Sequence, residues 1–346
     1  MASDVARPLL KPRSKMPPPA PPELVLITNL GTPRAATAED VREFLGEFLS
    51  DPLVVDYPAF FWQPLLKRII LRSRPARVAE MYRAIVSNGG GMPLAVGTAA
   101  IASALGKSRG PSFDVKPAYR YGSPSVSAQL AAALQMGHTA TVVPLFPQRT
   151  SSSSETIVEI VTQAAKSSRQ AATRIVRVAA DDAGYIEAVA DRVRAVGAFR
   201  HLVVSFHGIP RRYDRREGGR YRADCEATAR ALTAALGLGP NDATLCFQSR
   251  FGPEPWLGPA TFDTLRSLAK RGVRDVAVVM PGFVTEGLET LEEIGVRGRE
   301  TFLAAGGTGF SRVPAVCDHP AFIASLAARI RDARPDDRGE AIAHAR

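Results

Sequence analysis

Strand and helix signals alternate along almost the whole chain, and this alternation limits the fold more than any other feature. Short apolar runs bounded by glycine, proline or polar turns are each followed by a helical pattern. Such alternation predicts an α/β fold with mainly parallel sheets, because consecutive parallel strands need a crossover helix between them. Eight strands are expected, at residues 24–30, 115–121, 140–144, 174–178, 201–206, 243–247, 275–280 and 311–316.

The length of the chain and the expected strands predict two domains. A chain of 346 residues is too long for one ordinary hydrophobic core. The strands divide into two four-stranded halves joined by a helix at residues 181–196, which suggests an internal structural duplication. We expect one domain over residues 23–172 and the other over residues 173–333. The proline-rich basic segment 1–22 and the polar segment 334–346 are expected to be tails.

Charge and cysteine content narrow the functional classes. Cys225, Cys246 and Cys317 are widely spaced, so a disulfide framework, a zinc knuckle and an all-cysteine iron–sulfur cluster are unsupported. The net charge of +10 favours an acidic partner, but the scattered arginines show no nucleic-acid-binding signature. No apolar run is long enough to span a bilayer and the N-terminus has no signal-peptide core, so we expect a cytoplasmic protein.

A histidine at a strand end and a group of glutamates are the main candidates for chemistry. The apolar strand in V-V-S-F-H-G-I-P, residues 203–210, ends on His207, and ligands of open α/β sheets bind at the carboxyl ends of strands. Glu286, Glu289 and Glu293 follow the strand at 275–280, and at about 3.6 residues per turn they would share one helix face. The alternative for this face is an ordinary solvated surface.

A bulky apolar segment at residues 57–71, which we call the lip, departs from the alternating pattern. It is either a buried core helix or an exposed binding or membrane-contacting surface. Prolines at positions 58 and 64 and three arginines that follow the segment favour exposure. The residues expected to form this surface are Phe60, Phe61, Trp62 and Leu65.

Several motifs, in this order and at these separations, closely resemble the ferrochelatase family over about residues 24 to 330. The motifs are N-L-G-T-P (29–33), F-L-S-D-P-L-V-V-D (48–56), S-F-H-G-I-P (205–210), Q-S-R-F-G-P-E-P-W-L-G-P (248–259) and P-G-F-V-T-E-G-L-E-T-L-E-E (281–293).

This resemblance implies two Rossmann-like domains around a cleft in which ferrous iron is inserted into protoporphyrin IX, the terminal step of haem biosynthesis. The family's catalytic histidine and glutamate fall on His207 and Glu289, which suit ferrous iron as ligands. His207 acts either as iron ligand or as proton acceptor, and Glu286 and Glu293 extend an acidic path. Iron is a substrate, no cofactor is permanently bound, and no iron–sulfur cluster is expected. We expect peripheral contact with the inner face of an anionic membrane. We expect no nucleic-acid partner.

Further residues are assigned to the porphyrin by the same resemblance. Arg120 and Tyr121 would contact a propionate, since a guanidinium fork suits a carboxylate. Ser205 and Trp256 belong to motifs that wall the cleft. Leu30 stands where members acting on coproporphyrin typically have tyrosine, which favours protoporphyrin.

The chain also departs from the family pattern. Gly287 stands where many relatives carry histidine or cysteine, and Phe146 and Arg149 stand where tyrosines are common. Three alternatives remain open: a coproporphyrin ferrochelatase, an anaerobic cobalt chelatase and a non-catalytic tetrapyrrole-binding protein. The cobalt enzymes typically lack F-L-S-D-P and P-W-L-G-P, and a carrier needs neither a base nor a metal path.

Overall fold

The computed structural model describes residues 22–86, 90–110, 112–167 and 173–333, and the predicted tails, apart from Pro22, lie outside these ranges. The described strands form two four-stranded sheets in which every pairing is parallel, as predicted. The first has the order β2-β1-β3-β4, with β1 (Glu23–Asn29), β2 (Phe113–Tyr119), β3 (Ala140–Pro144) and β4 (Thr173–Ile175). The second has the order β6-β5-β7-β8, with β5 (His201–His207), β6 (Ala243–Gln248), β7 (Asp275–Val279) and β8 (Gly309–Arg312).

Both sheets have the same strand order relative to the chain, so the halves are alike in topology, as an internal duplication would make them. The boundary expected at residue 172 lies too early, because β4 pairs with β3 and completes the first sheet. That fourth strand is also shorter than expected and ends at Ile175.

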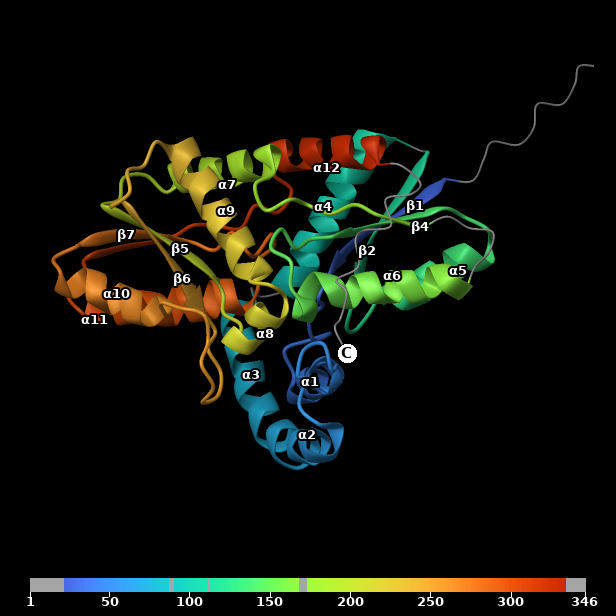
Figure 1. Cartoon of the computed structure of the whole chain (residues 1–346), viewed down its shortest axis with the longest axis horizontal. Helices are drawn as coiled ribbons and strands as arrows, with labels where there is room; N and C mark the ends of the chain where they lie inside the picture. The colour runs from blue at the N-terminus through green and yellow to red at the C-terminus, as the bar shows by residue number, and fades with distance from the viewer. Residues whose placement is uncertain (1–21, 87–89, 111, 168–172, 334–346) are drawn as a thin grey trace, which may run out of the picture.

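Helices cover both faces of the sheets, so the strands are buried and mostly apolar. In Figure 1 the second sheet lies at the left, the first at the right, α4, α7, α9 and α12 around and above the space between them, and α1 to α3 project below. The helices are α1 (Ala38–Ser50), α2 (Ala59–Leu65), η1 (Leu66–Ile70), α3 (Leu71–Ile85), α4 (Pro93–Arg109), α5 (Val126–Gln135), η2 (Ser151–Glu155), α6 (Thr156–Ser167), α7 (Ala183–Ala195), α8 (Arg211–Arg216), α9 (Arg220–Leu236), α10 (Thr261–Lys270), η3 (Glu289–Gly298), α11 (Arg299–Ala304) and α12 (Pro320–Asp332).

One hydrophobic cluster joins the two halves. It contains Val25 and Ile27 of β1 together with Val204 and Phe206 of β5. The crossover helix α7 contributes to the same cluster and packs against α12 and α9. The two sheets therefore share one interior.

The lip is helical, although its prolines make it irregular. Pro58 precedes α2, where a missing N–H costs nothing, and Pro64 lies near the end of α2, which continues into the wider π-helical turns of η1. The segment continues into α3. In the described part of the chain, no helix has both the length and the apolar character needed to cross a membrane.

Gly31, which follows β1, gives a test of this architecture because its backbone lies very close to the segment after β2. Its φ is +113°, and a Cβ at this position would overlap the carbonyl oxygen of Tyr121. We expect Gly31→Ala to lower the free energy of unfolding by more than about 3 kcal/mol, measured by urea denaturation. The control is Gly137→Ala, also at positive φ but with nothing near its Cβ, which should cost about 1–2 kcal/mol. Equal losses would contradict the close approach at Gly31.

Candidate active site

His207 is the last residue of β5, as predicted, and is partly buried. Its Nδ1 donates a hydrogen bond to the carbonyl oxygen of Gly208 at 2.7 Å, because a carbonyl can only accept. In the neutral ring the lone pair then lies on Nε2, which can take a proton or bind a metal ion. The hydroxyl of Tyr221 donates to the carbonyl oxygen of His207 at 2.7 Å and fixes the strand end against α9.

The three candidate glutamates do not share a helix face, which corrects the sequence prediction. The π-helix η3 begins at Glu289, so Glu286 lies before it. The carboxylate of Glu286 forms an ion pair with Arg312 at 2.7 Å and accepts the backbone N–H of Ala315 at 2.9 Å. Glu286 therefore binds β8 and the loop after it, and its carboxylate is not available for an acidic path.

Glu289 differs from its neighbours because its carboxylate is unpaired. The backbone N–H and the hydroxyl of Ser249 donate to Glu293 at 2.8 and 2.6 Å. By contrast, no other described residue donates a hydrogen bond to the carboxylate of Glu289. Burial raises the pKa of Glu289 above its ordinary value, and the charge of the nearby His207 opposes that rise. Glu289 is thus the glutamate of the three that is open to a ligand beside His207.

Gln248 fixes the position of Glu289 relative to β5. Gln248 ends β6, and its Nε2 donates to the backbone carbonyl of Glu289 at 3.0 Å. Its Oε1 accepts the hydroxyl of Ser205 at 2.8 Å, and Ser205 is fully buried. The expectation that Ser205 contacts the porphyrin is therefore wrong: the residue supports the site from behind through Gln248.

Arg120 and Tyr121 also differ from expectation. Both follow β2, but Arg120 pairs with the carboxylate of Asp51 at 2.5 Å, and the hydroxyl of Tyr121 donates to the same carboxylate at 2.8 Å. Tyr121 is only 1% exposed, so it has no surface for a propionate. These two side chains hold the end of α1 onto β2 instead.

Trp256 and Leu30 lie where residues bordering the site are expected. Trp256 forms an isolated β-bridge with Pro210, and a Cβ at Gly208 would lie 3.1 Å from the ring of Trp256. Leu30 follows β1 and is partly exposed. A Cβ at Gly287 would lie 3.2 Å from Oε2 of Glu289, so glycine there leaves space beside the unpaired carboxylate.

Sequence reasoning missed Tyr82 of α3. Burial and the charge of Glu289 raise the pKa of Tyr82, and α3 packs against η3. No motif marks this residue, because it reaches the site only through the tertiary packing of α3 against η3. Of the other departures noted above, Phe146 packs against the first sheet's core and Arg149 pairs with Asp224 at 3.2 Å.

Two of the four residues expected to form the exposed surface of the lip are exposed. Phe60 and Phe61 are 84% and 59% exposed. Trp62 is 6% exposed, and its Nε1 donates to the carbonyl oxygen of Leu49 at 2.7 Å, so its assignment to the exposed surface is wrong. Leu65 is partly buried. The exposed apolar surface is therefore formed by the two phenylalanines rather than by the tryptophan.

Comparison with known proteins shows which family this chain belongs to. A family model described as ferrochelatase matches residues 23–334. The chain belongs to the ferrochelatase family. It is 45% identical over 300 residues to the ferrochelatase of Edwardsiella ictaluri, covering 85% of this chain and 92% of that protein. It is 42% identical over 330 residues to the ferrochelatase of Bordetella pertussis, covering 92% of this chain and 91% of that protein.

Solved structures show the same fold. SirB from Bacillus subtilis with Fe3+ has a TM-score of 0.50 and 17% identity, covering 68% of this chain and 88% of that one. Enzymes of the ferrochelatase family are metal chelatases of the lyase class, which insert iron into a porphyrin, so the expected enzyme class is confirmed. Within the described ranges, no group of three or more His, Cys, Asp or Glu side chains is placed to hold a metal ion.

The unpaired carboxylate gives a pH-dependent prediction. A raised pKa of Glu289 means that the folded protein holds this proton more tightly than the unfolded chain. The resulting stability is present below the ordinary glutamate pKa and is lost as pH rises through the raised pKa. We therefore expect Glu289→Gln to melt at a higher temperature than the wild type at about pH 7, with the two converging near pH ~4.

The matched control is Glu300→Gln, at an exposed carboxylate on α11. It should show no such pH-dependent gain when both variants are followed by thermal denaturation across the same buffers. If Glu289→Gln is less stable than the wild type at neutral pH, the carboxylate is stabilised in the folded state and is not an unpaired group.

Proposed function

We propose that this chain inserts ferrous iron into protoporphyrin IX and so forms protohaem, the terminal step of haem biosynthesis. The observation that carries the proposal is the pairing of an imidazole whose Nε2 is available, at His207, with the unpaired carboxylate of Glu289. Family membership supports a porphyrin and iron as the substrates.

The two side chains supply what metal insertion requires. Both pyrrole N–H protons must leave as iron enters, so one group must accept protons and the developing positive charge needs a nearby anion. Donation of Nδ1–H from His207 to Gly208 fixes the tautomer and increases the basicity of Nε2, which helps it either to accept a proton or to bind iron. Glu289 beside it would offset that charge in a poorly solvated setting, where an anion acts strongly.

Protoporphyrin is the porphyrin we propose because the border of the site is apolar at Leu30.

The two carboxylates of the substrate also need cations. Arg74 of α3 lies over the ring of Phe251, 4.8 Å from the ring centre, and no described carboxylate pairs with it. Desolvation and the charge of Arg77 lower the pKa of Arg74, and an incoming propionate would offset both effects.

We further propose a cytoplasmic enzyme that binds the inner face of a membrane peripherally. Phe60 and Phe61 are exposed at the lip, and basic residues of η1 lie in the same segment. Apolar side chains beside cations favour binding to an anionic bilayer surface. No resident iron–sulfur cluster is proposed, because Cys225 and Cys246 are buried in separate elements, α9 and β6.

Replacement of the histidine tests the proposed chemistry. We expect His207→Ala to lower the rate of metallation by about 10²–10⁴-fold, because a positioned proton acceptor is lost. The measurement is the loss of free-base protoporphyrin fluorescence after addition of ferrous or zinc ion to purified protein. His138→Ala, in the turn after α5, is the control and should keep full activity.

Two outcomes would refute this proposal. A His207→Ala variant with more than about a tenth of wild-type turnover would remove His207 from the reaction. A wild-type protein that binds protoporphyrin but never metallates it would be a carrier rather than a chelatase.

Replacement of the phenylalanines tests the membrane contact. We expect the wild type to co-sediment with vesicles that contain phosphatidylserine, less so as salt rises, because each basic residue near the surface contributes about 1 kcal/mol. The double variant Phe60→Ser and Phe61→Ser should bind several-fold more weakly. The control is Met136→Ser, at an apolar residue that is 64% exposed at the end of α5. Equal binding of both variants would show that the lip does not contact lipid.

A further inference from the structure

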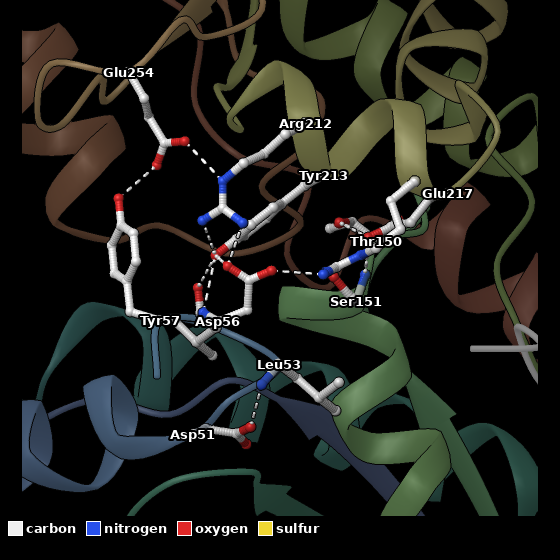
Figure 2. Close-up of polar contacts among 12 residues, drawn as sticks. Asp51, Leu53, Asp56, Tyr57, Thr150, Ser151, Arg212, Tyr213, Glu217 and Glu254 are labelled. Carbon is white, nitrogen blue, oxygen red and sulfur yellow. Dashed lines mark hydrogen bonds and ion pairs between the residues drawn. The ribbon is translucent and has the colours of Figure 1, made fainter. Parts of the chain in front are cut away.

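A network of charged side chains centred on Asp56 joins the two halves of the molecule (Figure 2). Asp56 lies between α1 and α2, just before the lip, and its carboxylate forms ion pairs with Arg212 and Arg216 of α8. The hydroxyl of Tyr213 donates to the same carboxylate at 2.9 Å and accepts the backbone N–H of Asp56 at 3.1 Å. Asp56 thus binds three side chains of one short helix.

A second carboxylate extends the network to the Trp256 loop. Glu254 accepts a hydrogen bond from Nε of Arg212 at 2.8 Å and another from the hydroxyl of Tyr57 at 3.1 Å. The guanidinium of Arg212 also lies over the rings of Tyr213 and Tyr57, at 4.4 and 5.4 Å from the ring centres. Arg212 therefore contacts the beginning of the lip and the loop that carries Trp256 at the same time.

The network is partly shielded from water. The side chains of Asp56 and Arg212 are 18% and 35% exposed. Although burial alone would raise it, hydrogen bonds from Arg212, Tyr213 and Arg216 hold the pKa of Asp56 below its ordinary value. The carboxylate therefore stays ionised near neutral pH, and the ion pairs are worth more than fully exposed ones.

These contacts reach three segments that are close in sequence to residues of the proposed site or to the lip. The lip follows Asp56 directly, α8 follows the strand end of His207 after three residues, and Glu254 stands two residues before Trp256. None of the network residues touches the reacting groups themselves: His207 is held separately by Tyr221, and Glu289 by Gln248.

From this geometry we propose that Asp56 is a positioning residue for the porphyrin: its ion pairs hold the lip against α8 and the Trp256 loop, so that the entrance is preformed before substrate binds. The proposal rests on the proposed function. A preformed entrance spares the substrate the entropic cost of ordering the lip. Loss of the network should therefore weaken porphyrin binding and leave the chemical step intact.

Steady-state metallation of protoporphyrin by the full chain tests this split. Asp56→Asn keeps the size of the side chain and removes its charge. We expect the KM for protoporphyrin to rise about 3- to 10-fold, with kcat and the KM for metal ion within about twofold of the wild type. Arg212→Met should do the same, and the double variant should add little, because both changes break one network. Asp56→Glu, which keeps the charge, should recover most of the lost affinity.

Hydrogen–deuterium exchange gives a readout that does not depend on activity. In Asp56→Asn, amides of residues 59–71 should exchange at least about 5-fold faster, whereas those of α5 should be unchanged. The control is Arg266→Met, which breaks a surface ion pair with Asp263 on α10 and should alter neither KM nor exchange in the lip.

Each result decides a separate question. Unchanged exchange in the lip of Asp56→Asn would overturn the proposal, as would a fall in kcat with an unchanged KM, which would make the network a general brace. If the wild type does not metallate porphyrin at all, the proposed function fails, and the exchange data alone then decide whether Asp56 holds the lip.

Discussion

The side-chain amide of Asn29 is the contact on which the geometry of the site depends. Asn29 ends β1, an inner strand of the first sheet, and is buried, and its Nδ2 donates to Thr98 at 3.3 Å and to Thr285 at 3.1 Å. One amide thus joins β1, α4 and the segment that leads directly into the glutamates of the second half. Gly97 allows this approach, because a Cβ there would lie 2.9 Å from the Cβ of Thr285. Loss of such a partner leaves buried donors or acceptors unsatisfied, at about 1–3 kcal/mol each.

Behind this contact, the buried polar groups divide between support and chemistry. Glu286 and Glu293 are saturated by Arg312 and Ser249, and their bonds fix the two ends of the segment that carries Glu289. The carboxylate of Glu289 receives no hydrogen bond from another described residue in the same region. A partly buried carboxylate without a partner costs stability, and such groups gather at functional sites, which is why the proposed function is built on Glu289.

The halves are held together by contacts of different kinds at different depths. Apolar residues of both sheets form one interior, and the amide of Asn29 links the strand ends above it. Nearer the surface, Glu217 after α8 accepts the backbone N–H of Ser151 at 3.1 Å, beside the Asp56 network in Figure 2. The short segment after His207 is therefore fixed to the first half at two points. Contacts near the interior define the distance between the sheets, while those near the surface control the lip.

The sequence alone determined the sheets, because the burial of a parallel strand is recorded in its own run of apolar residues. Local apolar runs in the sequence also placed His207 at a strand end and the phenylalanines of the lip in one segment. The tertiary structure alone decided which polar side chains are free. Arg120 and Tyr121 were expected at the porphyrin but are bound by Asp51, Ser205 supports Gln248, and Trp62 is bonded to Leu49. A charged or polar side chain takes whichever partner the fold brings near it, as Asp56 takes Tyr213 from 157 positions away, and no local periodicity records that choice.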